Sequence, residues 1–179
     1  MSTVVTGLYE SVQDVNTTLE DLNKKGYSTD KVSLITRKDM VERNFDVKNA
    51  LSDGVQTGLV AGSVVGGIVG LLVGLGAITL PGIGAIFVAG PLATALGLTG
   101  AAGLTASGAV TGALAGGILG ALKEIGIDEV EAKVIENKIR KGQTFLMVSP
   151  VNGDDNEVKN VLKSHKATDI MSMQLNLTM

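Results

Sequence analysis

The feature that most constrains this 179-residue chain is a stretch of 69 residues, from Gly54 to Leu122, without one charged side chain. All 15 Lys and Arg and all 18 Asp and Glu lie in the flanks, which have the charge content of ordinary soluble domains. Of the 24 glycines, 19 fall inside the uncharged stretch. This sharp boundary indicates that the stretch and its flanks occupy different surroundings. It divides the chain into residues 1–53, 54–122 and 123–179.

Glycines recur every four residues in two parts of the uncharged stretch. Because positions four apart lie on one face of a helix, each series predicts a helix with a smooth groove that a second backbone can approach closely. A single GxxxG is a weak signal, whereas five and then three units in register favour close helix packing. The predicted helix-packing glycines are Gly54, Gly58, Gly62, Gly66, Gly70 and Gly74 in the first series and Gly108, Gly112, Gly116 and Gly120 in the second.

Between the two series the segment LPGIGAIFVAGPL contains residues that turn the chain. We therefore expect a helical hairpin, with each arm long enough to exceed the roughly 30 Å of bilayer hydrocarbon. Because both flanks build one domain, two antiparallel spans would return the chain to the same side, and basic residues at both boundaries favour a cytoplasmic domain. The predicted hairpin-turn residues are Pro81, Gly82, Gly84, Gly90 and Pro91.

The surroundings of this predicted hairpin have two interpretations. Glycine and alanine contribute little transfer free energy, so a soluble oligomer that buries the hairpins against each other is an alternative to a hairpin in or on a membrane. A lone monomer would expose more apolar surface than monomers tolerate. The expected partners are therefore further copies of the chain and membrane lipid.

The flanks alternate between strand and helix patterns and predict an α+β domain. The order is β-α-β, insertion, α-β-α-β, which resembles a ferredoxin-like domain with the glycine-zipper helical hairpin inserted after the second strand. Helices are expected after caps at Ser11 and Asp128, the latter with Val130, Val134 and Ile135 or Ile139 on one side. We expect the flanks alone, joined from residue 50 to residue 124, to fold. The predicted strands are Thr3–Tyr9, Lys31–Thr36, Thr144–Ser149 and Met171–Thr178, and the last helix is Asp155–Lys166.

Residues that carry chemistry are scarce. The net charge of −3 argues against a nucleic-acid partner, and the absence of cysteine excludes thiol catalysis, disulfides and thiolate metal sites. His165 is the only histidine and is interpreted as a solvated surface residue. The glycines match neither a P-loop nor the dinucleotide fingerprint. We therefore expect no catalytic residue, no cofactor and no metal, and no secretory signal pattern opens the chain.

Three stretches together resemble a known family: VVTGLYESVQDVNTTLEDLNKKGYSTDKVSLITR, LPGIGAIFVAGPL and GALKEIGIDEVEAKVIENKIRKGQTFLMV. They are similar to the general stress protein 17M-like family of bacterial proteins induced by heat or low temperature. Asp128 stands where the family more usually has Pro, and both residues suit a helix start. The Met-rich last strand has no counterpart in the resemblance. The resemblance implies a stress-induced, non-enzymatic protein and supplies no catalytic residues.

Together these patterns predict a stress-response protein that is not an enzyme. It assembles with itself through the glycine-zipper hairpin, in or on a membrane, and its α+β domain stays in the cytoplasm. The alternatives are a channel or pore and a soluble oligomeric module that senses a small ligand. The lack of charge throughout the hairpin weakens an ion-selective pore, because such paths are lined by charged rings or coordinating filters.

Overall fold

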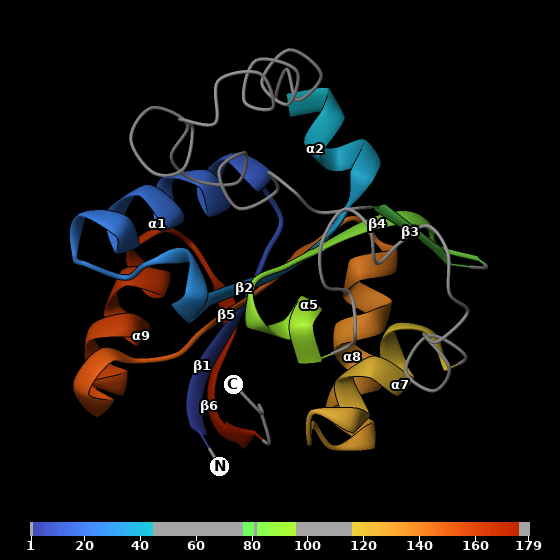
Figure 1. Cartoon of the computed structure of the whole chain (residues 1–179). Coiled ribbons are helices and arrows are strands. Elements are labelled where there is room, and N and C mark those ends of the chain that lie inside the picture. The colour runs from blue at the N-terminus through green and yellow to red at the C-terminus, as the bar shows by residue number, and fades with distance from the viewer. Residues whose placement is uncertain (1, 45–76, 81, 96–115, 176–179) are drawn as a thin grey trace.

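The computed structural model of this chain describes residues 2–44, 77–80, 82–95 and 116–175 (Figure 1). Its six strands form one antiparallel sheet in the order β3-β4-β2-β5-β1-β6. The strands are β1 Ser2–Tyr9, β2 Val32–Arg37, β3 Ala77–Leu80, β4 Gly84–Ala89, β5 Thr144–Val148 and β6 Thr168–Leu175. The helices are α1 Val12–Lys24, α2 Lys38–Asn44, α5 Pro91–Ala95, α7 Gly117–Glu124, α8 Glu129–Arg140 and α9 Asp155–Ser164, with short 3₁₀ turns at Thr29–Lys31 and Val151–Gly153.

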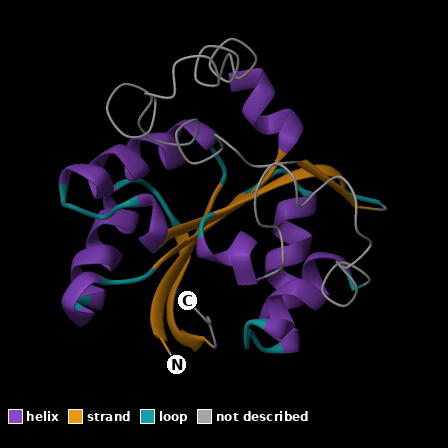
Figure 2. Ribbon diagram, viewed as in Figure 1, coloured by secondary structure: helices purple, strands orange, loops and turns teal. Residues whose placement is uncertain are grey.

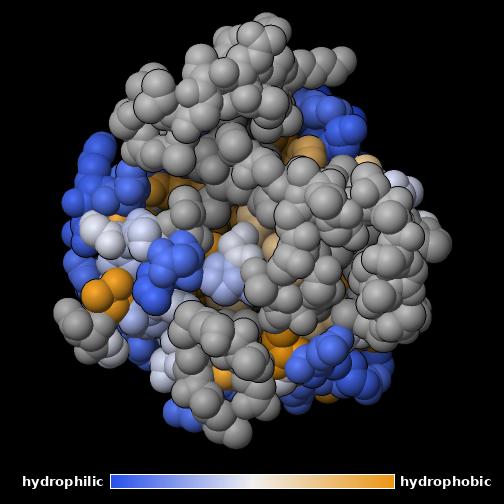
Figure 3. All heavy atoms as spheres, viewed as in Figure 1, coloured by the Kyte–Doolittle hydropathy of each residue, from blue (hydrophilic) through white to orange (hydrophobic). Residues whose placement is uncertain are grey.

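Helices cover both faces of this sheet, which gives the described part three layers (Figure 2). Helices α1 and α9 lie side by side over one face, and α2 adds Val41 to the same apolar cluster. Helices α5, α7 and α8 cover the other face and bury Leu92, Ile118 and Ile135 against it. On the side seen in Figure 3 the described residues at the outline are mainly hydrophilic, with small hydrophobic areas between them. The sheet is therefore an interior layer.

The central strand β5 explains how one sheet serves two cores. Its side chains are all buried, and they alternate between the two clusters. Phe145 and Met147 belong to the cluster under α8, whereas Leu146 and Val148 belong to the cluster under α1 and α9. A strand buried on both faces reads as a continuous apolar run. The prediction of a central strand at Thr144–Ser149 is confirmed.

The helix starts predicted from the sequence are also confirmed. The Ser11 hydroxyl accepts hydrogen bonds from the backbone N–H groups of Gln13 and Asp14, and the Asp128 carboxylate accepts them from Val130 and Glu131. Such caps satisfy donors that the first helical turn leaves unpaired. Helix α1 ends before Gly26, whose φ of +88° suits glycine.

The interpretation of the uncharged stretch as one helical hairpin is wrong for its middle part. Residues 77–80 and 84–89 are strands β3 and β4, and β4 pairs with β2 in register Ile35↔Val88. The run from Ile86 to Ala89 is fully buried. A short apolar run without alternation is common to buried strands and buried helices, so its pattern did not distinguish them. Part of the segment 54–122 thus belongs to the same sheet as the flanks.

Two further expectations for the flanks need correction. Val130 and Val134 of α8 do not face inward: their exposed fractions are 71% and 46%. Ile135 and Ile139, which the sequence also placed on the apolar side, are buried, and together with Ala132 they form the buried face of α8. Helix α2 was not expected, because it is short and its one buried apolar residue gives no period.

The last strand keeps the alternation that its sequence predicts. Met171, Met173 and Leu175 are half-buried or buried, while Ser172 and Gln174 are exposed. Residues 176–179, which complete the predicted strand, lie outside the described residues. β6 pairs with β1 and forms one edge of the sheet.

Candidate functional site

Most of the predicted helix-packing glycines lie outside the described residues. The structure places only Gly116 and Gly120, at the start of α7. The carbonyl of Gly116 accepts a hydrogen bond from the Gly120 N–H at 3.1 Å, and α7 packs against α8. The other positions, whose role in assembly stays a prediction, are Gly54, Gly58, Gly62, Gly66, Gly70, Gly74, Gly108 and Gly112.

The predicted turn residues do reverse the chain, but between two strands and not between two helices. Gly82 and Gly84 join β3 to β4 with φ values of +76° and +92°, which L side chains rarely adopt. Gly90 follows β4 with φ +74°, and Pro91 is the first residue of α5. Pro81 lies outside the described residues.

Gly90 stands where the backbone of β4 meets the start of β2. A Cβ atom at this position would lie 1.9 Å from the Val32 carbonyl oxygen and 3.0 Å from the Ser33 Cα. Immediately afterwards the N–H of Leu92 donates a buried hydrogen bond to the Ser33 hydroxyl at 3.0 Å. This glycine thus permits α5 to return directly over the sheet.

An arginine pair fastens the β3–β4 turn to the rest of the domain. Arg140, at the end of α8, donates to the Gly82 carbonyl at 3.2 Å and to the Glu136 carboxylate at 2.9 Å. Arg37, at the end of β2, donates to the Arg140 carbonyl at 3.1 Å and pairs with Asp39. The Arg140–Gly82 and Arg37–Arg140 contacts join positions 58 and 103 apart in sequence, so no local pattern could reveal them.

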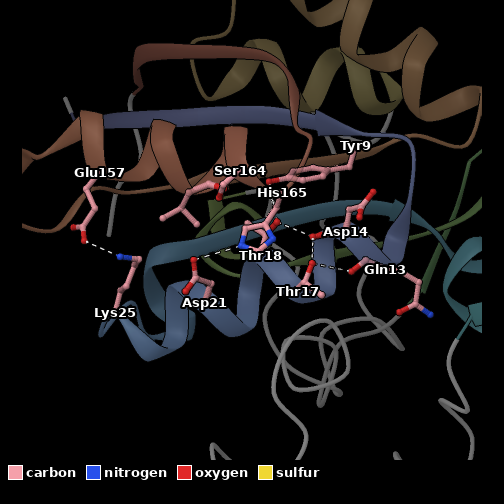
Figure 4. A network of polar contacts seen from close by, with 11 residues as sticks. Tyr9, Gln13, Asp14, Thr17, Thr18, Asp21, Lys25, Glu157, Ser164 and His165 are labelled. Atoms are coloured by element: carbon pink, nitrogen blue, oxygen red, sulfur yellow. Dashed lines mark hydrogen bonds and ion pairs between the residues drawn. The ribbon is translucent and has the colours of Figure 1, made fainter.

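The most connected polar network lies between α1 and α9 (Figure 4). His165, at the C-terminal cap of α9, has its Nε2 atom 3.4 Å from the Asp21 carboxylate of α1. Its side chain is 26% exposed, so this surface histidine is partly solvated and has a carboxylate partner that the sequence did not predict. The partner is 144 positions away in sequence, which is why the residues around His165 gave no signal.

Two further ion pairs, one at each end of the network, also join the α1 segment to the α9 segment. Lys25, which caps α1, lies 3.6 Å from the Glu157 carboxylate of α9. Lys166, just after α9, lies 3.1 Å from the Asp14 carboxylate of α1. Because these pairs are largely exposed, each contributes little to stability. They join the two helical segments at both ends of the network.

Beneath these charges lies the buried hydroxyl of Tyr9. The Thr18 hydroxyl is 3.1 Å from it and 2.7 Å from the Asp14 carbonyl oxygen. A threonine hydroxyl has one proton, so when it donates to the carbonyl, the Tyr9 hydroxyl donates to Thr18. Burial is the main reason why the pKa of Tyr9 is raised far above its ordinary value.

The raised pKa of Tyr9 predicts that the folded protein loses stability at alkaline pH. The unfolded chain ionises this tyrosine near pH 10, whereas the folded chain keeps its proton. The stabilising contribution is therefore complete below pH 10 and decreases above it, by about 1.4 kcal/mol per pH unit. In Tyr27→Phe, which leaves Tyr9 as the only tyrosine, we expect tyrosinate absorbance to appear only together with loss of far-ultraviolet circular dichroism. Ionisation of Tyr9 in the folded protein would contradict this prediction.

The described residues contain no group of three or more His, Asp or Glu side chains placed to hold a metal ion. None of the described helices is long and apolar enough to cross a membrane. Comparison with known proteins found no matching family model, no matching curated protein and no matching solved structure. The proposals below accordingly rest on the residues of this chain.

Proposed function

We propose that this protein is a non-enzymatic stress-response protein that assembles with itself through its glycine series, in or on a membrane. The observation that carries the proposal is the glycine spacing: six glycines at intervals of four in the first series and four in the second, with no charge between Gly54 and Leu122. Interior glycines cost helix stability in water, by roughly 1 kcal/mol each relative to alanine. Their repeated use is reasonable where close backbone approach compensates for that cost.

The domain that presents these segments is, in this proposal, ferredoxin-like at its centre. Support comes from the strand order β2-β5-β1-β6, which is antiparallel throughout, and from α1 and α9 lying on the same face. In a plain βαββαβ arrangement the second face of the sheet has no helix of its own. Here α5, α7 and α8 occupy that face.

The coverage of both sheet faces by helices supports assembly of the chain more than it supports ligand sensing by the domain. Both sheet faces are already covered by described helices, so the sheet needs no further apolar segment to cover it. The proposal assigns contacts with other copies and with lipid to the uncharged residues 54–76 and 96–115, which lie outside the described residues. The family resemblance adds the expectation of induction by stress and of a domain in the cytoplasm.

Replacement of Gly66 by leucine tests the assembly part of the proposal. Leucine raises both hydrophobicity and helix propensity, yet it fills the groove where a second backbone would approach. We expect Gly66→Leu to dissociate the assembly in matched detergent, as measured by size-exclusion chromatography with light scattering. Val60→Leu, which enlarges a neighbouring residue outside the glycine series, is the matched control and should keep the parent's mass.

The location is tested separately, by fractionation of the expressed full chain. We expect the protein in the detergent-soluble pool, or in the pool that alkaline carbonate strips from membranes. If all of the protein is recovered in the soluble pool and is still assembled, the membrane part of the proposal is wrong. The glycine contacts would then hold together a soluble oligomer.

A further inference from the structure

Strand β6 is an edge of the sheet that the described residues form, and no described strand pairs with its outer side. Within the described part of the chain its only strand neighbour is β1. The opposite edge, β3, has four residues, whereas β6 has eight. Unpaired N–H and C=O groups on an edge can pair with the strand of another chain, so natural proteins usually protect long edges.

In β6 the protection is confined to the first residues. Asp169 has a φ of +48° and forms an ion pair with Lys138 of α8. The register with β1 shifts between Thr6 and Leu8, opposite this same part of β6. From residue 171 to residue 175 there is no charge, no proline and no register shift. We name residues 171–175 the open edge.

The side chains of the open edge separate into an apolar row and a polar row. Met173 packs against the cluster under α7 and α8, and Leu175 is buried in that cluster. Met171 is half-buried in the same row, as the period of two requires. Ser172 and Gln174 point to the other face and are exposed.

We propose that the open edge pairs antiparallel with the open edge of a second copy of this chain. The two copies are related by a two-fold axis perpendicular to the sheet, which keeps corresponding helical layers on the same side. Residues opposite each other in an antiparallel pair point to the same face. The axis therefore passes midway between one residue and its own counterpart in the second copy, and the two central candidates for that residue are Ser172 and Met173.

In both registers, within the open edge, the apolar row lies opposite the apolar row of the second copy and the polar row lies opposite the polar row. With the axis at Ser172, Met171 lies opposite Met173 of the second copy and Ser172 lies opposite its own counterpart. With the axis at Met173, Met171 lies opposite Leu175 and Ser172 lies opposite Gln174. Apolar pairs and uncharged polar pairs across strands both stabilise a sheet. Within residues 171–175 these pairs contain no charge that would repel a second copy, and we infer from this self-match that the occupant is the chain itself; in the register centred on Ser172, Leu175 also lies opposite Asp169.

The inference is independent of the glycine series, because it uses a different surface. It also gives a role to the Met-rich last strand. Methionine side chains adapt to irregular gaps and suit a row that is half-buried in one copy and buried between two. A full chain with Gly66→Leu should therefore still form the β6 pair.

Single cysteines test the pairing directly, since the chain has no cysteine of its own. Opposite Cα atoms in an antiparallel pair are about 4.5–5.5 Å apart, within the range that a disulfide spans. Under mild oxidant we expect either Ser172→Cys or Met173→Cys to form a covalent dimer, at least about fivefold above the exposed control Asn156→Cys on α9. If neither variant exceeds this control, the proposal is wrong.

Like charges test the same interface without oxidation. Ser172→Lys combined with Gln174→Lys places lysines on both copies across the pair, and we expect the mass of the Gly66→Leu chain to fall by half. The matched control carries Asn156→Lys and Asn160→Lys, two exposed positions on α9, and should keep the dimer. A lysine variant with the dimer mass, or a Gly66→Leu parent that is already monomeric, would overturn the inference.

Discussion

Replacing Gly90 by alanine is expected to lower the free energy of unfolding by about 4 kcal/mol or more, a large share of the stability of an ordinary domain. A left-handed conformation costs an L residue roughly 1–2 kcal/mol. The larger part comes from the new Cβ, which would lie 1.9 Å from the Val32 carbonyl oxygen. Backbone atoms on two strands would have to separate. Urea unfolding followed by circular dichroism measures the change.

Gly84→Ala is the matched control for this clash. Gly84 also has a positive φ, +92°, but nothing lies within 4 Å of the position that its Cβ would occupy. We therefore expect it to lose only the conformational part, about 1–2 kcal/mol. If the two variants are equally stable, close approach to β2 is not what requires glycine at residue 90.

Removal of the whole uncharged stretch is expected to abolish folding. In a chain that joins residue 50 to residue 124 through a short linker, β3, β4, α5 and most of α7 are missing. The loss includes Ile86, Phe87, Leu92, Ile118 and Leu122, all buried. At about 2 kcal/mol for each side chain, this approaches the entire stability of a domain. We expect no cooperative thermal transition, which corrects the expectation from the sequence that the flanks fold alone.

A smaller replacement provides the control. A chain in which residues 54–74 alone become a Gly-Ser linker of equal length retains every buried residue of the two described clusters. We expect this chain to unfold cooperatively and to lose its assembly. Cooperative unfolding of the larger deletion would show instead that β3, β4 and α7 are accessory to the fold.

The elements that the sequence predicted are those with a local physical signal. Ser11, Asp128 and Asp154 cap helices, and the helices after them have buried rows at helical spacing. The all-apolar run at residues 144–148 and the alternation from Met171 onward identified two strands in the same way.

The elements that it did not predict depend on contacts between distant residues. β4 is an apolar run that begins and ends beside glycines, and its pairing with β2 and β3 makes it a strand. Arg140 holds the Gly82 carbonyl across 58 positions, and His165 meets Asp21 across 144. Of the candidate site, the turn glycines were found because positive φ favours glycine. The glycine series stays a prediction, since most of it lies outside the described residues.

The position of β1 in the sheet has a consequence for how the chain is made. β1 leaves the ribosome before the other described strands, yet its two neighbours, β5 and β6, begin at residues 144 and 168. At about 5–20 residues per second, roughly 7–28 s of translation separate β1 from β5. The uncharged stretch emerges within this interval, before its own domain can close. The glycine series is thus synthesised while the sheet of its own domain is still incomplete.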